Sequence, residues 1–286
     1  MLDHVLGAIL SRERTDLVSA RYTENGVELP VGEGLWATAD AIGPYRHEIA
    51  DSAGEEAACF TTVIEGKTRS HLALRVKRES GAVREIEAMV ARPPLFGGAD
   101  AFGDGPAALN ASGAPDPGWF AGIPAAERIE RAELQRISDL YFAGLEKNDG
   151  RGEYPFADDC IRIENGFRVT QVPPDPAAGK TPYAERLRSL NAREQFETGF
   201  FRFVDRIRER RFPVIDEGRG TVFCFAFFDH SGTVRQYELA DGTPVTASID
   251  RPFSWMIAEA FRVERGLITL IEALMTQVPY GHRSGW

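Results

Sequence analysis

Residues 161–167, which read Ile-Arg-Ile-Glu-Asn-Gly-Phe, repeat the pattern of residues 21–27, which read Arg-Tyr-Thr-Glu-Asn-Gly-Val. Two more pairs of segments match in the same order along the chain, 73–76 with 260–263 and 85–89 with 270–274. One short match arises by chance, whereas three matches in order indicate a duplicated domain. We therefore predict two copies of one fold.

The length of the chain agrees with two copies. Its 286 residues approach the upper limit for a single hydrophobic core, which favours two domains. Residues 93–123 are dominated by Gly, Pro and Ala and show no lasting periodicity. They predict an extended linker between a first domain, 1–92, and a second, 124–286. Four aromatic residues in the linker can hold it against a domain surface: Phe96, Phe102, Trp119 and Phe120.

Each copy has the pattern of an α+β domain, in which helices precede a run of antiparallel strands. In the second copy, the apolar periodicity predicts a helix over 124–148, and a further helix is expected over 189–208. Insertions at 172–188 and 230–254 distinguish this copy, and Asp241-Gly242 in the later one indicates a hairpin. Each insertion is either a lid over a pocket or a surface elaboration.

The charge of the chain excludes some partners. Its net charge is −10 and its isoelectric point is about 5.1, so nucleic acid and anionic membrane surfaces are not expected to bind. No run of 18 apolar residues predicts a membrane span. The first ten residues predict a helix and not a secretion signal, because Asp3 and His4 interrupt the apolar run.

The three cysteines, Cys59, Cys160 and Cys224, are far apart in sequence. This spacing argues against a disulfide framework or a cysteine-rich zinc site and favours reduced, buried thiols in a cytoplasmic protein. No histidine spacing typical of a metal site occurs either, so we expect no metal.

Three segments of the second half resemble ketosteroid isomerase and its relatives in the nuclear transport factor 2-like superfamily. Residues 140–149 resemble the end of the family's first helix, 156–164 its first strand, and 257–264 its penultimate strand. The resemblance implies two tandem cone-shaped domains, each a curved, mostly antiparallel sheet with helices on its concave face. The fold hosts many functions, so the reaction must be argued from the site.

Residue by residue, the resemblance implies a catalytic triad. Tyr141 matches the helix position that donates a hydrogen bond to an oxyanion. Glu164 matches the carboxylate base, and Glu259 matches a carboxylic acid that stays protonated and donates a second hydrogen bond. Both acids are Asp in the isomerases, and the extra methylene of each Glu argues against identical steroid chemistry. Because Glu24-Asn25-Gly26 repeats Glu164-Asn165-Gly166, Glu164 can instead be a residue of a turn.

Elementary chemistry supports these roles. A carboxylate can remove a proton next to a carbonyl group, and two donors in a dry pocket can stabilise the resulting oxyanion. On the strand of Glu259 the same face carries apolar residues, which would keep the carboxyl group neutral. The expected substrate-binding residues are Phe156, Phe201, Phe225, Phe227, Phe261 and His230. His230 is either an acid–base group at the rim or a residue of the hairpin turn.

Other charged residues allow simpler explanations. Leu72 occupies the first-copy position matching Glu259, so that copy is interpreted as structural, a cap or a weak binding site. Glu87 and Glu272 recur in both copies, which suggests structural pairing, for example with Arg75 and Arg262. Arg162 either forms a salt bridge or binds a substrate carboxylate.

The main hypothesis is a cofactor-independent isomerase or lyase that acts on a small, hydrophobic, oxygenated substrate, cyclic or aromatic in character. The alternatives are a non-catalytic module for ligand binding or protein interaction, and an enzyme similar to polyketide cyclases. The exposed sheet faces predict either a homodimer or pairing of the two copies within one chain.

Overall fold

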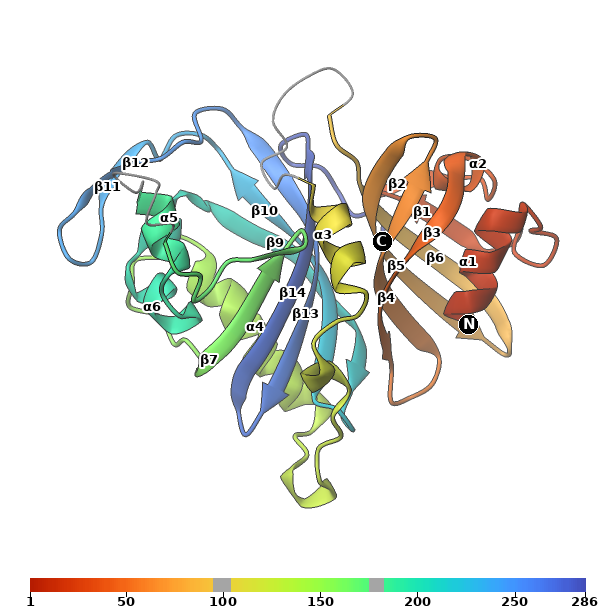
Figure 1. Ribbon diagram of the computed structural model, residues 1–286, viewed down its shortest axis with the longest axis horizontal. Helices are drawn as coiled ribbons and strands as arrows, with labels where there is room; N and C mark the ends of the chain where they lie inside the picture. The colour runs from red at the N-terminus through yellow and green to blue at the C-terminus, as the bar shows by residue number, and fades with distance from the viewer. Residues whose placement is uncertain (95–103, 175–182) are drawn as a thin grey trace.

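The computed structural model describes residues 1–94, 104–174 and 183–286, and two six-stranded sheets dominate it (Figure 1). The first sheet contains β1 (Arg21–Glu24), β2 (Val27–Leu29), β3 (Ala39–Ala50), β4 (Glu56–Glu65), β5 (Thr68–Glu79) and β6 (Ala82–Ala91). The second contains β7 (Phe156–Glu164), β8 (Phe167–Arg168), β9 (Arg206–Asp216), β10 (Thr221–His230), β13 (Phe253–Glu264) and β14 (Leu267–Val278).

The two sheets have the same topology. Their strand orders are β2-β1-β6-β5-β4-β3 and β8-β7-β14-β13-β10-β9, and neither sheet closes into a barrel. In each sheet one pairing is parallel, β1 with β6 and β7 with β14, and the rest are antiparallel. The predicted α+β fold with two similar halves is confirmed.

The repeated Asn-Gly pair explains why the two halves begin alike. Asn25 and Asn165 have φ angles of 48° and 43°, and each precedes a glycine that also has a positive φ. Two such residues form the type I′ turn that joins paired strands. The Asn165 side chain also bonds the backbone N–H and C=O of Met275 on β14, at 2.8 and 3.0 Å, and Asn25 bonds Val90 in the same way.

Helices cover the outer face of each sheet, and α3 (Gly105–Ser112), described below, lies between the halves (Figure 1). Helices α1 (Leu2–Ser11) and α2 (Leu35–Thr38) pack on the first sheet, and α4 (Arg131–Leu145), α5 (Tyr183–Arg188), α6 (Ala192–Glu197) and the 3₁₀ turn η3 (Phe200–Phe203) belong to the second half. The predicted helix over 189–208 is wrong in extent. Gly199, with φ of 72°, separates α6 from η3, and Arg206 already begins β9. The helix expected over 124–148 is shorter and follows a 3₁₀ turn, η2 (Ala125–Glu127).

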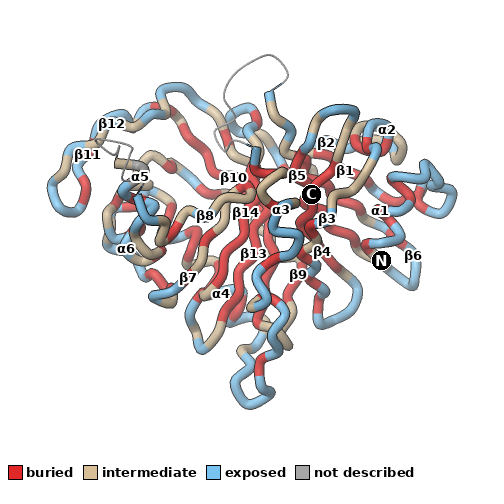
Figure 2. Tube along the Cα trace, viewed as in Figure 1, coloured by how far each residue is buried: buried red, intermediate tan, exposed pale blue. Residues whose placement is uncertain are grey.

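The inner faces of the two sheets pack against each other and form a shared core, seen as buried chain between the halves in Figure 2. The first sheet contributes Tyr45, Phe60 and Met89, among others, and the second contributes Phe223, Phe225 and Phe227. Tyr45 and Phe225 come from different halves, yet each is 2% exposed or less. Burial of this aromatic surface stabilises the association of the halves.

Two polar contacts cross this interface at equivalent positions. Arg211 of β9 pairs with Glu87 of β6, and His47 Nδ1 of β3 lies 2.6 Å from Glu272 of β14. His47 and Arg211 face Phe60 and Phe225, which are matching residues of β4 and β10. Each half therefore extends its edge strand over a buried carboxylate of the other.

The predicted pairing of these glutamates is correct for only one of them. Arg75 approaches Glu87 at 3.5 Å, as expected. Glu272 instead accepts hydrogen bonds from Tyr45, and Arg262 pairs with Glu264. The difference follows from the strand register, because Arg75 lies directly opposite Glu87 whereas Ala260, and not Arg262, lies opposite Glu272.

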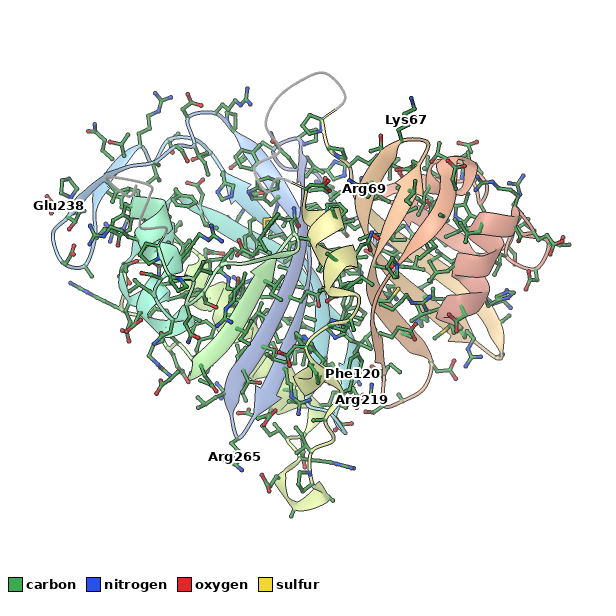
Figure 3. The ribbon with its side chains drawn as sticks, viewed as in Figure 1. Lys67, Arg69, Phe120, Arg219, Glu238 and Arg265 are labelled. Carbon is green, nitrogen blue, oxygen red and sulfur yellow. The ribbon has the colours of Figure 1, made fainter. Side chains whose placement is uncertain are left out.

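The segment expected to be an extended linker contains a helix. Asp104 caps α3 (Gly105–Ser112), which packs between the halves and precedes the 3₁₀ turn η1 (Pro117–Phe120). Trp119 is buried in the shared core, whereas Phe120 is exposed and lies beneath the guanidinium of Arg219, 5.8 Å from its ring centre (Figure 3). Phe96 and Phe102 lie outside the described residues.

The later insertion contains the predicted hairpin, β11 (Gln236–Glu238) paired with β12 (Pro244–Thr246). Of the earlier insertion, residues 175–182 are not described, and α5 lies in the remainder. Within the described residues, no helix is both long and apolar enough to cross a bilayer.

Candidate functional site

The face of the second sheet that α4 and α6 cover carries the candidate site. Ile257, Phe261 and Val263 of β13 lie in the core beneath these helices, as the alternation of strand side chains requires. Glu259 stands between them on the same face and is 1% exposed. The structure therefore places an acidic side chain in an apolar surface, as the sequence predicts.

Helix α4 brings Tyr141 onto this face. Its ring centre lies 5.0 Å from Phe261, 5.4 Å from Phe196 and 6.2 Å from Phe156. Burial raises the pKa of Tyr141 well above its usual value. The hydroxyl group therefore stays protonated and can donate a hydrogen bond.

Strand β7 contributes Arg162 and Glu164, which share a face because they are two residues apart. Arg162 Nη2 donates to Glu164 Oε1, and Nη1 donates to Gln195 Oε1 at 3.0 Å. The side chains of Arg162 and Glu164 are 6% and 15% exposed. Glu164 thus carries the negative charge of a largely buried ion pair.

Glu259 differs from Glu164 in having no ion-pair partner within the part of the chain that the structure describes. Tyr141 and Arg162 interact with its carboxyl group, but neither carboxyl oxygen has a hydrogen-bond partner of good geometry among the described residues. Burial raises the pKa of Glu259 to about 8, against the opposing attraction of Arg162. At neutral pH this group is mainly the neutral acid.

The site therefore combines a charged carboxylate, a neutral carboxyl group and a phenol on one apolar surface. Where the surroundings keep one of two neighbouring acids charged and the other neutral, the charged acid can act as the base and the neutral acid can donate a hydrogen bond. Glu164 is suited to accept a proton, and Tyr141 and Glu259 are suited to donate to a developing oxyanion. The arrangement can support abstraction of a proton next to a carbonyl group.

Three of the six residues expected to bind substrate lie around this cluster. Phe156 and Phe261 contact the Tyr141 ring, as described above. Phe201 packs on Phe196 at 5.4 Å, and the Arg162 guanidinium lies 5.4 Å from its ring centre. Phe201 is only partly buried and is therefore the aromatic side chain of this group that reaches solvent.

The other three expected residues do not lie around this cluster. Cys224 is directly opposite Glu259 in the sheet, so the odd-numbered Phe225 and Phe227 of β10 point to the opposite face, toward the first half. His230 shares the face of Cys224 but is six residues away, about 20 Å along an extended strand. Its Nδ1 lies 3.2 Å from the carbonyl oxygen of Phe203.

The sequence did not single out Gln195 or Phe196. Both lie on α6 and meet β7 residues more than thirty positions earlier, a distance that no local pattern bridges. A usable signal was the Asn191-x-x-Glu194 capping box, which fixes the start of α6. From that start, the helical spacing of α6 turns Gln195 and Phe196 toward the sheet.

The first half lacks an equivalent site. Cross-strand register places Leu74 opposite Cys59, as Glu259 is opposite Cys224, so Leu74 is the counterpart of Glu259, and not Leu72. The match of 73–76 with 260–263 is displaced by two residues. Glu24 accepts hydrogen bonds from Tyr22, the Leu35 N–H and Arg92, at 2.6–2.8 Å. These bonds give Glu24 a structural role.

Three described surface cavities lie on the first half or at its border. Their volumes are about 380, 420 and 720 Å³. The first includes Lys67 and Arg69, and the second includes Arg219 (Figure 3). None of the three is lined by Tyr141, Glu164 or Glu259, and the side chains of Tyr141 and Glu259 are buried.

Comparison with known proteins gives a match to the second half of the chain. The model of a family described as a domain of unknown function, DUF8021, matches residues 127–275, just over half of the chain. The matched range contains every residue of the cluster. No curated protein matches the chain.

Proposed function

The chain belongs to the family of the domain of unknown function DUF8021, and we propose that its second half is a cofactor-independent isomerase or lyase. The reaction proceeds by proton abstraction and stabilisation of an enolate or phenolate. The substrate is a small, hydrophobic, oxygenated molecule with a ring. The same arrangement of residues supports membership of the nuclear transport factor 2-like superfamily as part of this proposal.

The observation that carries the proposal is the difference between two neighbouring carboxyl groups. Glu164 is ion-paired with Arg162, whereas Glu259 is buried, lacks a hydrogen-bond partner of good geometry among the described residues and has a pKa raised to about 8. A purely structural glutamate would be expected to have its oxygens satisfied, because an unpaired buried polar group destabilises the fold. Glu259 is thus better explained by a ligand that accepts its proton in a hydrogen bond.

The proposed roles follow from the positions. Glu164 removes a proton from the carbon next to a carbonyl group, and the electrons move onto the carbonyl oxygen. Tyr141 and the neutral Glu259 donate hydrogen bonds to that oxygen. Returning the proton at another carbon gives isomerisation, and loss of a leaving group gives elimination. The aromatic rings of Phe156, Phe196 and Phe261 exclude water and hold an apolar ring.

A second function is a binding module without catalysis. The closed packing over the cluster favours it, since Tyr141, Arg162 and Glu259 are each 5% exposed or less. A binding module would hold its ligand without changing it. An enzyme would in addition exchange the acidic proton of a carbonyl ligand for deuterium, because it must form the enolate.

Titration with phenols and naphthols tests the proposal, because a phenolate mimics the oxygen of an enolate. We expect 2-naphthol to bind and to lose roughly 1–3 kcal/mol of binding free energy in Tyr141→Phe, the range for a lost charge-assisted hydrogen bond. Tyr280→Phe is the matched control, since Tyr280 is exposed. Absence of binding, or an equal effect of both substitutions, would refute the oxyanion site.

A further inference from the structure

Arg162 has a buried donor nitrogen, Nε, without an acceptor among the described residues. Its Nη1 and Nη2 groups donate to Gln195 and Glu164, but its buried Nε–H has no acceptor among the described residues. The side chain is 6% exposed, so bulk water does not readily supply that acceptor. A buried, unsatisfied donor on a cation is costly and points to a partner of complementary charge.

The guanidinium is also held in a fixed orientation. Gln195 Nε2 donates to the carbonyl oxygens of Val169 and Leu187 at 2.6 and 3.0 Å, which leaves Gln195 Oε1 to accept from Arg162. The Arg162 guanidinium carbon further lies 5.4–6.0 Å from the ring centres of Phe201, Tyr141 and Phe196. The Nε–H therefore keeps its direction before any ligand binds, which strengthens binding.

The groups around this point are donors at neutral pH. They are the Arg162 Nε–H, which has no acceptor among the described residues, the Tyr141 hydroxyl, which interacts with Glu259, and the carboxyl proton of Glu259, which burial retains. A neutral ketone offers one oxygen with two acceptor sites. A carboxylate offers two oxygens with about four, together with the charge that suits a buried guanidinium.

We propose that Arg162 binds an acidic oxygen of the substrate, so that the substrate class is an aromatic or alicyclic carboxylic acid. The substrate's carboxylate accepts from Arg162 Nε, which leaves Tyr141 and Glu259 to donate to the carbonyl oxygen that becomes the oxyanion. Gln195 is a positioning residue that fixes the guanidinium. This inference rests on the proposed function, because it uses the same surface and the same two oxyanion donors.

The test compares a charged ligand with a neutral one of the same shape. Wild-type protein is titrated with 2-naphthoate and with 2-naphthamide, and we expect naphthoate to bind at least tenfold more tightly. Arg162→Gln should weaken naphthoate binding by about tenfold to hundredfold, the range for a hydrogen bond to a charged group, and change naphthamide binding much less. Arg188→Gln, which removes an exposed charge from α5, should alter neither ligand.

The comparison within the wild type needs no variant, so a folding defect in Arg162→Gln does not decide the result. Equal binding of naphthoate and naphthamide would overturn the inference, as would an equal loss of both in Arg162→Gln. If 2-naphthol binds in a Tyr141-dependent way but naphthoate has no advantage, only the carboxylate class is wrong. If no ligand depends on Tyr141, the proposed function itself fails.

Discussion

Glu259→Gln replaces a buried carboxyl group by a neutral amide of similar shape, and we expect it to change how stability depends on pH. Burial raises the pKa of Glu259 from 4.5 to about 8. The unfolded chain loses this proton near pH 4.5, whereas the folded chain keeps it until about pH 8. The folded state therefore binds more protons between these values, so the free energy of unfolding of the wild type falls as pH rises through this window.

The size of the effect follows from the two pKa values. Each tenfold change in an ionisation constant corresponds to about 1.4 kcal/mol. Relative to pH values below 4.5, the wild type loses on the order of 5 kcal/mol of unfolding free energy above pH 8 and roughly 3 kcal/mol at pH 7. The glutamine does not titrate, so the variant escapes this loss. The difference in free energy of unfolding, variant minus wild type, should therefore increase by these amounts as the pH rises from 4.5.

The assay is urea unfolding of both proteins at pH 4.5, 7 and 8.5, with the free energy extrapolated to water. Glu238→Gln is the control, because Glu238 is exposed on the hairpin (Figure 3) and should change little with pH. A difference between Glu259→Gln and the wild type that stays constant across pH would show that Glu259 is not a buried neutral acid. The reasoning would then be refuted.

Two further predictions concern the contact between the halves. Arg211→Gln removes a partner of the fully buried Glu87 and should lower the free energy of unfolding by about 3–5 kcal/mol, whereas Arg136→Gln, at an exposed ion pair, should change it far less in the same urea assay. Phe225→Ala should lower the free energy of unfolding by about 3–5 kcal/mol. It should leave 2-naphthol affinity unchanged, because Phe225 faces the first half. Weaker 2-naphthol binding would contradict the face assigned to Phe225.

The α+β class and the two similar halves could be predicted from the sequence because local residues indicate them. The Asn-Gly pairs at 25–26 and 165–166 require positive φ angles, and only a tight turn between paired strands provides them in both halves. The alternation of Ile257, Glu259 and Phe261 likewise gives the buried face of β13 without any tertiary information.

The remaining features depend on cross-strand register or on distant contacts. Phe225 lies on the opposite face from Glu259 because Cys224, and not Phe225, stands opposite Glu259, a pairing that no single strand reveals. The two-residue error between Leu72 and Leu74 has the same origin, because only the hairpin register aligns the strands. The contact between Arg162 and Gln195 joins a strand to a helix and could not be read from spacing.

The central claim is that Tyr141 and Glu259 stabilise a negatively charged oxygen. The measurement that tests it most directly is an absorbance titration of 2-naphthol bound to the protein, compared with free 2-naphthol. The account predicts that the bound naphthol ionises at lower pH than the free compound and that Tyr141→Phe reduces this difference. Ionisation of bound naphthol at the same or a higher pH would contradict the claim.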